Sequence, residues 1–448
     1  MSARAYRAYS EYKDSGVEWL GKVPTAWEVK RLRFVSESNP VPSEVRGLPG
    51  DTEISFVPME AVGERGGLAL EAKKLLADVK AGYTYFRDGD VVIAKITPCF
   101  ENLKGALADG LTNGIAFGTT ELHVLRANEG VNRRFAFYAT LSDAFRRLGE
   151  ADMYGAGGQK RISESFVRDF PLALPSVTEQ HAIATFLDRE TARIDALVAK
   201  KERLITLLQE RRTALITRAV TKGLDPAAPM KDSGVAWLGE IPAHWDVKRI
   251  KTFAEVVNGS TPSRENPEYW SGVYPWLNSS VVNRDEVLLG SDFVTTRALR
   301  ECHLPRIAPP AVLVAITGEG KTRGMATVLS IEATISQHLA AIKPVRRDGD
   351  VNYLLFVLTA TYQYLRDESG GAGSTKGALT CEQLGNLAVP IPPASEQQVI
   401  STFVAESLFQ IDTLVDRVRT AITRLHELRT ALISAAVTGK IDVREAAQ

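Results

Sequence analysis

Long apolar runs, paired cysteines and an excess of charge of either sign are all missing from this sequence of 448 residues. The longest apolar run, Ala311–Thr317, is far shorter than the roughly 20 residues that a membrane-spanning helix needs, and it is typical of a buried strand. The N-terminal segment lacks the hydrophobic region of a signal peptide. We therefore expect a cytoplasmic protein that does not act at a membrane.

Cysteine occurs only three times, at Cys99, Cys302 and Cys381. An odd number of widely spaced cysteines indicates a reducing compartment and provides neither a disulfide framework nor the spacing of a zinc site. The six histidines are scattered as well, and no carboxylate cluster has metal-ligand spacing. The sequence therefore predicts no bound metal ion.

The charges balance, because 54 lysines and arginines face 54 aspartates and glutamates. A net charge of zero offers no support for nucleic-acid binding. This objection is weaker if the basic residues are concentrated on two local surfaces, or if partner subunits supply much of the phosphate contact. The contents of 44% hydrophobic and 24% charged residues are typical of a globular protein.

Motifs for catalysis or cofactor binding are incomplete. The segment Asn266–Tyr269 (NPEY) is similar to the Asn-Pro-Pro-Tyr motif with which adenine methyltransferases hold a flipped base, but its third residue differs and no glycine-rich S-adenosylmethionine motif accompanies it. We interpret it as a turn ahead of an aromatic core residue, Trp270. Gly318–Thr322 resembles the end of a phosphate-binding loop, but Ala315 stands where the first glycine belongs. We expect no catalytic residue and no cofactor on this chain.

An internal repeat is the strongest feature that the sequence does contain. Lys13–Gly21 (KDSGVEWLG) recurs as Lys231–Gly239 (KDSGVAWLG), and each copy continues through a proline, a tryptophan and Val-Lys-Arg. A second match relates the segments that begin at Glu179-Gln180 and at Glu396-Gln397. The matched ends bracket a middle that differs in sequence and almost preserves its length. The pattern predicts two similar frames that hold divergent inserts.

The matched C-terminal part of each unit has the periodicity of one long helix. Thr178 and Ser395 are candidate N-caps, and Gly223 and Gly439 lie near the other ends. Spacings of three and four residues alternate along both helices, which is typical of a coiled-coil seam. The seam residues are Ile194, Leu197, Lys201, Leu204, Leu208, Arg211 and Leu215 in the first helix and Ile411, Leu414, Val418, Ala421, Leu425, Leu428 and Leu432 in the second.

Each helix could simply cover the core of its own domain. Two helices of matching length and register, each too long for one small domain, favour pairing with each other instead. The second would return beside the first in the opposite direction. We therefore expect an antiparallel coiled coil, about 65 Å long at roughly 1.5 Å per residue, with a variable domain at each end.

Each variable insert combines strands and helices. Runs at 90–97 and 311–317 have the composition of strands and are separated by glycine, asparagine and proline turns, while 135–148 and 354–365 have helical periodicity. The inserts therefore predict small α+β domains.

A glycine-rich loop with a lysine closes each insert, at 155–161 and 370–376. Such a loop can bring backbone N–H groups close to phosphates, although a flexible surface turn is the commoner explanation of any single one. Its occurrence at the same place in both copies favours a function.

A family resemblance follows from these segments. The stretch Asn258–Asn278 (NGSTPSRENPEYWSGVYPWLN), the glycine loop after it and Pro390–Gln397 (PIPPASEQ) resemble the target-recognition domain of type I restriction-modification specificity subunits. The resemblance covers nearly the whole chain, including both Glu-Gln helix starts and the domain order. It implies a pseudo-twofold repeat with a first target-recognition domain at 1–177, a central helix at 178–222, a second target-recognition domain at 223–394 and a C-terminal helix at 395–448.

The resemblance also implies partners. Such a subunit would have no active site of its own and would bind double-stranded DNA, two methyltransferase subunits and two restriction-translocase subunits. S-adenosylmethionine, ATP and magnesium would be bound only by those partners, which would carry out adenine-N6 methylation and ATP-dependent cleavage. Each recognition domain would read one half of a bipartite target. Because the inserts differ, we expect the half-sites to differ.

Polar and basic residues at strand ends and loops are the candidate DNA contacts, since there they can reach phosphates or base edges in the major groove. A solvated surface charge is the alternative for each. The candidates are Lys95, Thr97, Lys104, Gln159, Lys160 and Arg161 in the first domain and Asn278, Lys321, Thr322, Arg323, Ser374, Thr375 and Lys376 in the second.

Two other functional classes remain open. An enzyme acting alone, such as a nuclease or a methyltransferase, would show turnover when purified as a single chain. A coiled-coil interaction module that never touches DNA would leave its assembled complex unable to bind a defined duplex.

Overall fold

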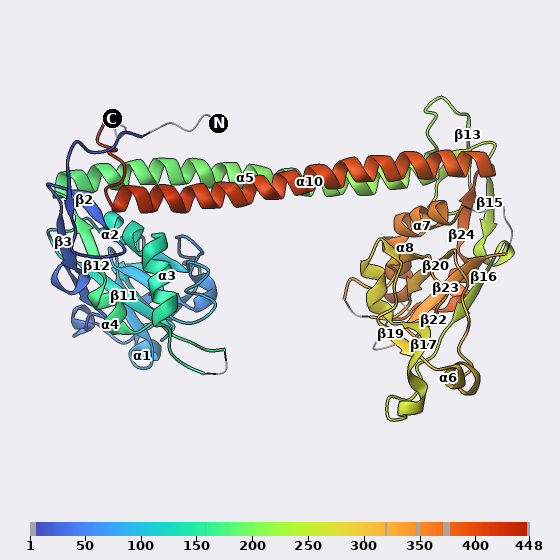
Figure 1. Cartoon of the computed structure of the whole chain (residues 1–448), viewed down its shortest axis with the longest axis horizontal. Coiled ribbons are helices and arrows are strands. Elements are labelled where there is room, and N and C mark those ends of the chain that lie inside the picture. The colour runs from blue at the N-terminus through green and yellow to red at the C-terminus, as the bar shows by residue number, and fades with distance from the viewer. Residues whose placement is uncertain (1–5, 157, 319, 346–349, 371–376, 446–448) are drawn as a thin grey trace. The chain divides into compact units, whose positions relative to one another are not determined.

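The computed structural model describes residues 6–445 except 157, 319, 346–349 and 371–376. The chain divides into two compact units, the first made of Met1–Glu202 with Arg419–Gln448 and the second of Arg203–Val418. There are two long helices, α5 (Val177–Lys222) and α10 (Ala394–Val437). Each contributes one segment to the first unit and another to the second. In Figure 1 the colour bar follows the chain through these units.

The first unit contains α5 up to Glu202, α10 from Arg419 and the following shorter elements. Its strands and helices are β1 (Tyr12–Asp14), β2 (Lys22–Pro24), β3 (Glu28–Arg31), β4 (Ser36–Ser38), β5 (Glu53–Val57), β6 (Lys73–Leu75), α1 (Leu76–Val79), β7 (Thr84–Arg87), β8 (Val91–Ala94), β9 (Gly105–Leu107), β10 (Ile115–Gly118), β11 (Leu122–Ala127), α2 (Arg133–Thr140), α3 (Asp143–Asp152), α4 (Glu164–Asp169) and β12 (Pro171–Leu174).

The second unit contains the remaining segments of α5 and α10. Its shorter elements are β13 (Met230–Asp232), β14 (Glu240–Pro242), β15 (Asp246–Arg249), β16 (Ala254–Asn258), β17 (Trp270–Leu277), β18 (Glu286–Val287), β19 (Asp292–Val294), α6 (Thr296–Glu301), β20 (Ala311–Ala315), β21 (Ala326–Leu329), β22 (Thr334–Ile335), β23 (Leu339–Pro344), α7 (Val351–Ala360), α8 (Tyr362–Gly370), α9 (Cys381–Asn386) and β24 (Ala388–Ile391).

Both units repeat one strand order although their inserts differ in sequence. A central sheet runs β4-β11-β8-β9 in the first unit and β16-β23-β20-β21-β18 in the second. A side sheet runs β6-β5-β10-β7 in the first and β19-β17-β22 in the second, and each contains one parallel pair, β5 with β10 or β17 with β22. The mixed α and β content predicted for the inserts is confirmed.

The two inner strands of the central sheets read as continuous apolar runs because both of their faces are buried. In β8, Val91 and Ile93 pack into the core beneath α2, whereas Val92 and Ala94 pack into a second core on the other face. In β20, Val312 and Val314 face the core of α7 and the alternate residues face another. The prediction of a buried strand at 311–317 is therefore confirmed.

The repeated tryptophans anchor the frame of each unit. Trp27 and Trp245 are fully buried, and each contacts the glycine after the end of a long helix, Gly439 for Trp27 and Gly223 for Trp245. Both glycines have a φ of +71°, and a Cβ on Gly439 would lie 2.4 Å from Pro24 Cδ. Glycine is required there because the left-handed conformation and the close approach exclude a side chain.

The repeated glutamines have an equally specific role. Gln180 donates from Nε2 to the carbonyl of Pro175 at 2.9 Å and accepts at Oε1 from the Asn132 backbone N–H at 2.8 Å. Gln397 makes the same pair of bonds, to the Pro392 carbonyl at 2.9 Å and from the Asp350 N–H at 3.0 Å. Each buried amide thus joins the start of a long helix to the N-cap of α2 or α7.

The predicted helix starts were wrong by a few residues. Ser176 accepts from the Glu179 N–H at 3.3 Å and caps α5, so Thr178 lies inside the first turn. The N–H groups of Glu396 and Gln397 bond to the Pro393 carbonyl, which places Ser395 inside α10. The predicted helix ends are confirmed, because α5 ends at Lys222, directly before Gly223, and α10 ends at Val437, two residues before Gly439.

The long helices pair within each unit, but the predicted seam was partly wrong. In the second unit Ile411 and Val415 pack against Leu208, whereas the predicted seam residues Leu414 and Leu204 are 42% and 39% exposed. An ion pair of 2.7 Å joins Arg212 to Asp412 in this unit. In the first unit Leu428, another predicted seam residue, is 50% exposed. In the second unit the buried residues of α10 are Ile411, Val415 and Val418, which are spaced by four and then three residues. The predicted seam had a spacing of three and then four.

No helix in the described part of the chain is long and apolar enough to span a membrane.

Candidate DNA-recognition surfaces

A three-residue turn occupies the same place in each unit. It carries the chain from the side sheet to the central sheet and comprises 119–121 between β10 and β11 and 336–338 between β22 and β23. We refer to it as the crossover turn. Its last residue bonds to the C-terminal end of β8 or β20, through the Lys95 N–H to the Glu121 carbonyl at 2.9 Å and the Ile316 N–H to the His338 carbonyl at 3.0 Å. Each turn therefore lies where the ends of several strands meet.

The first unit brings five of its six candidate DNA contacts to this turn. Lys95 accepts at its carbonyl from the Ile162 N–H at 2.9 Å, which joins the end of β8 to the segment after the glycine loop. The Thr97 hydroxyl donates to the Gly158 carbonyl at 2.7 Å and accepts from the Lys160 N–H at 3.1 Å. The side chains assembled by these backbone contacts are those of Lys95, Thr97, Gln159, Lys160 and Arg161.

Arg161 carries an ion pair with the crossover turn. Its Nε and Nη2 donate to both carboxylate oxygens of Glu121 at 2.9 and 2.8 Å. These hydrogen bonds lower the pKa of Glu121 below its ordinary value, despite its partial burial. Lys160 and Gln159 are exposed beside the pair. The cationic charge available for phosphate here therefore comes first from lysine.

Lys104 belongs to a different environment. Its ammonium donates to the carbonyl of Met59 at 2.9 Å and is partly buried. Its backbone forms an isolated bridge with Glu64. This contact holds the 59–64 segment to the start of β9, so its geometry favours a structural role over a DNA contact.

The second unit brings Lys321 and Thr322 together in the hairpin between β20 and β21. Helix α8 supports this hairpin, because the Tyr362 hydroxyl donates to the Lys321 carbonyl at 2.6 Å and Arg366 Nη1 donates to the Gly320 carbonyl at 2.7 Å. Lys321 itself is exposed. At the base of the hairpin the Thr317 hydroxyl lies 2.7 Å from His338 Nδ1 of the crossover turn.

Asn278 and Arg323 have local structural contacts. The Asn278 side chain accepts from the Ser280 N–H at 2.9 Å and caps a short 3-10 helix, Ser279–Asn283, directly after β17. Arg323 is only 9% exposed, and its Nη1 donates to the Gly377 carbonyl at 2.6 Å. This burial argues against a direct DNA contact by Arg323, whereas Asn278 is partly exposed beside the crossover turn.

The remaining candidates, Ser374, Thr375 and Lys376, lie outside the described residues. The positions of the two glycine loops in the sequence can be compared by counting back from the helix that follows each of them. Ser163 caps α4 and Thr380 caps α9 at equivalent places in the two units. Lys160 comes three positions before its cap and Lys376 four positions before. The two loop lysines are thus one residue out of register.

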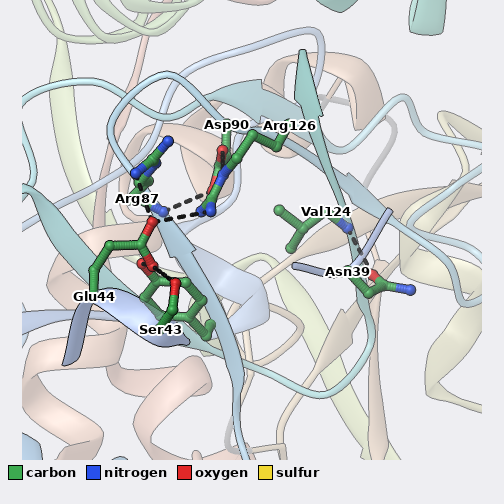
Figure 2. Close-up of polar contacts among 8 residues, drawn as sticks. Asn39, Ser43, Glu44, Arg87, Asp90, Val124 and Arg126 are labelled. Carbon is green, nitrogen blue, oxygen red and sulfur yellow. Dashed lines mark hydrogen bonds and ion pairs between the residues drawn. The ribbon is translucent and has the colours of Figure 1, made fainter. Parts of the chain in front are cut away.

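A buried polar network stands apart from these loops in the first unit (Figure 2). Arg126 makes two hydrogen bonds of 2.8 Å to Asp90, which is 1% exposed, and a third of 3.1 Å to Glu44. Arg87 and the Tyr85 hydroxyl also donate to Glu44, at 2.5 and 2.7 Å. Burial and the bond to this carboxylate raise the pKa of Tyr85 to about 12. The network fastens the segment around Glu44 to strands β7 and β11, and Arg126 links it to Asp90 directly before β8.

The segments that resemble catalytic motifs form ordinary structure. Asn266 caps a 3-10 turn, Pro267–Tyr269, and the Trp270 indole donates to the Ser263 carbonyl at 2.9 Å. The segment 318–322 joins two antiparallel strands, whereas a phosphate-binding loop leads into a helix. Within the described ranges no three His, Cys, Asp or Glu side chains are grouped as metal ligands.

Sequence reasoning missed the crossover turn itself. Thr120 and Gln337 at its tips are exposed and were not among the candidates. Each follows a strand of the side sheet and lies 43 residues before the cap of α4 or α9 (163 − 120 and 380 − 337), which is the signal that could have found them.

Comparisons with known proteins agree with this architecture. The sequence profile of the type I restriction modification DNA specificity domain matches residues 242–422. Over 93% of its length the chain is 27% identical to the EcoEI specificity subunit of Escherichia coli, of which the match covers 83%. The chain is therefore similar to type I restriction enzyme specificity subunits.

Two further matches show what this chain is similar to. It is 42% identical to the EcoAI specificity subunit of Escherichia coli over 36% of its own length and 27% of that protein. The HsdS subunit from Thermoanaerobacter tengcongensis superimposes with a TM-score of 0.55 at 20% identity, covering 94% of this chain and 98% of that one. A chain solved in work on assembly and conformational transition of the type I restriction-modification system gives a TM-score of 0.73 at 19% identity over 93% and 98%.

Proposed function

We propose that this chain is a type I specificity subunit that reads a bipartite, asymmetric DNA target, one half with each unit, and directs adenine-N6 methylation and ATP-dependent cleavage by its partners. The observation that carries the proposal is the repetition of one sheet order with different loop residues around the crossover turn. A common scaffold positions two recognition surfaces in the same way, while different side chains read different bases.

The boundaries that we propose for these parts are 1–177 and 223–394 for the recognition domains and 178–222 and 395–448 for the shared C-terminal segments. We propose that α5 and α10 form an antiparallel coiled coil and relate the domains by a pseudo-twofold axis. Pairing of the helices within each unit supports this arrangement, through Asp195 and Arg429 in the first unit and through Arg212 and Asp412 in the second. An approximate dyad in the protein would match the dyad of a split DNA site.

The partners in this proposal are two methyltransferase and two restriction-translocase subunits in the cytoplasm. S-adenosylmethionine, ATP and magnesium would be bound by those subunits. Exposed Gln159, Lys160 and Lys321, with the partly exposed Lys95, Thr97, Arg161, Asn278 and Thr322, would contact the DNA. The partners would also supply phosphate contacts, which accounts for a neutral chain that binds a polyanion.

A duplicated chain tests the proposal most directly. Its second recognition domain, 223–394, is replaced by the equivalent part of the first, and the chain is expressed with its partner subunits in a host that lacks other adenine methylation. Long-read sequencing of the host genome should show that the natural chain methylates an asymmetric split motif and that the duplicated chain methylates a symmetric one. An unaltered motif in the duplicated chain would contradict the division of the target between two domains.

A further inference from the structure

The two crossover turns are held by matching hydrogen bonds and carry different side chains at their tips. We propose that Thr120 in the first unit and Gln337 in the second each read one base edge of the corresponding half-site. The inference rests on the proposed function and names the specificity-determining residues within it. Neither residue is part of the loops from which the other candidate contacts come.

The turn has the same internal geometry in both units. The Thr119 hydroxyl accepts from the Glu121 N–H at 3.2 Å, and the Ser336 hydroxyl accepts from the His338 N–H at 3.3 Å. Such a hydroxyl contact to the backbone two residues on fixes a tight turn. The residue between the two bonded positions is held at the tip.

Strands on both sides hold the turn in place. Its first residue donates to the end of a parallel neighbour, from Thr119 N–H to the Val57 carbonyl at 3.1 Å and from Ser336 N–H to the Leu277 carbonyl at 2.8 Å. Its last residue accepts from the end of β8 or β20. The position of the tip is therefore set by backbone bonds that do not depend on the tip side chain, and that side chain is free to vary with the base to be read.

The surroundings of the tip distinguish it from an arbitrary exposed turn. In the first unit Lys95 is bonded to the turn, and exposed Lys160 is held through Thr97 in the adjoining loop. In the second unit the hairpin of Lys321 reaches the turn through Thr317 and His338. Lysines that can contact phosphates thus flank a polar side chain that can reach a base, which is the division of labour found in sequence-specific interfaces.

The two tip side chains have the chemistry of base readers. A glutamine amide offers a donor and an acceptor that match N7 and N6 of adenine, and the Thr261 hydroxyl donates to Gln337 Oε1 and restrains the amide. Threonine offers a hydroxyl and a methyl group, the latter suited to the methyl of thymine. We therefore expect Gln337 to read an adenine and Thr120 a different base, so that the two halves differ at this position.

The test uses the assembled methyltransferase complex with Gln337→Ala or Thr120→Ala. Equilibrium binding is measured against a set of duplexes in which each specified base pair of each half-site is substituted in turn. Gln337→Ala should reduce discrimination at one position of the second half-site by about tenfold or more, because a bidentate contact is lost. Thr120→Ala should reduce it at one position of the first. All other positions should keep their discrimination.

Matched controls come from the same units. Gln363 is exposed on α8 and donates to Asp367 at 2.8 Å, and Thr185 is exposed on α5, so Gln363→Ala and Thr185→Ala should leave every position unchanged. Gln337→Glu keeps the shape of the side chain but leaves only acceptors. It should shift the preference at that position from adenine towards cytosine, whose N4 is a donor.

Each outcome decides the inference. A loss confined to one position per variant supports it. Unchanged discrimination, or weakening that is equal at all positions, overturns it, because equal weakening indicates a phosphate contact or a structural role. If Gln337→Ala melts at a lower temperature than the natural chain, the result with Gln337→Glu decides. If the natural chain itself shows no defined target, the proposed function is wrong. If the natural chain has a defined target and both tip variants discriminate it as well as the natural chain does, only this inference is wrong.

Discussion

Equivalent positions of the two central sheets carry ion pairs of different kinds. Arg126 of β11 and Lys343 of β23 correspond, because each lies opposite a glutamate of the edge strand, Glu37 and Glu255. Arg126 bonds to the buried carboxylate of Asp90, whereas Lys343 forms an exposed ion pair of 3.0 Å with Glu255. One unit therefore contains a buried ionic network where the other keeps its charges at the surface.

The sheet order does not require this network. Register places Ala311 of the second unit, which is fully buried, at the position of Asp90 in the first. The second core is complete with an alanine there. What the first unit gains is attachment of the segment around Glu44, which Arg87, Arg126 and Tyr85 hold. The comparison teaches that the frame sets the fold and that each insert stabilises its own loops.

Removal of the buried cation should have the largest effect. Arg126→Met should lower the free energy of unfolding by about 3–5 kcal/mol, because Asp90 is left buried without its partner. Lys343→Met should cost less than about 1 kcal/mol, since its ion pair is exposed. Denaturant unfolding followed by circular dichroism measures both.

A double variant sharpens this comparison. Asp90→Ala with Arg126→Met gives the first unit the alanine that the second has, and should recover most of the lost stability. Equal losses of stability for Arg126→Met and Lys343→Met would show that the buried network and the exposed ion pair contribute equally to stability.

The buried helix positions should behave alike in both units. Val198 and Val415 are 8% and 7% exposed, so an alanine at either should lower the free energy of unfolding by about 1.5 kcal/mol from two lost methyl groups. Leu414→Ala should cost less, because Leu414 is 42% exposed. If Leu414→Ala lowers the free energy of unfolding more than Val415→Ala does in the same assay, the seam predicted from the sequence is correct and the packing described above is not.

Lysines near the recognition loops should differ in their effect on DNA binding. Lys160 is exposed, and Lys160→Ala should weaken binding by the methyltransferase complex and make its salt slope shallower by about one unit. Lys104 donates to the Met59 carbonyl, so Lys104→Ala should leave the slope unchanged. Titration of the cognate duplex at several salt concentrations measures the slopes, and equal slopes for both variants would reject this distinction.

Lowering the pH should weaken the ion pair of the first crossover turn, with a smaller effect on stability than the substitutions above. The pKa of Glu121 is lowered in the folded chain, so its bonds to Arg161 stabilise the fold above the ordinary glutamate value of 4.5 and are lost as the pH falls through the lowered value. Glu121→Gln should therefore make stability fall less steeply below pH 4.5. Thermal melts from neutral to acidic pH check this. A decline as steep as in the natural chain would mean that Glu121 contributes nothing to it.

The sequence by itself determined the frame of this protein. The Glu-Gln helix starts and the glycines after both long helices depend on caps and backbone conformation, which a short segment encodes, and the repeated tryptophans are visible in the repeat itself. The buried strands were predictable for the same reason, because strands covered on both faces are continuously apolar. The two segments that resemble a methyltransferase motif and a phosphate-binding loop could also be rejected from the sequence, because each lacks a residue that its motif requires.

Only the tertiary structure decided which residues meet. The choice of Val415 over Leu414 for the seam depends on which neighbour packs against the helix, since both fit a spacing of three or four. The burial of Arg323 depends on the Gly377 carbonyl, which is distant in sequence. The crossover turn acquires its surroundings from strands that the sheet order brings together, and a single sequence has no local signal for that order.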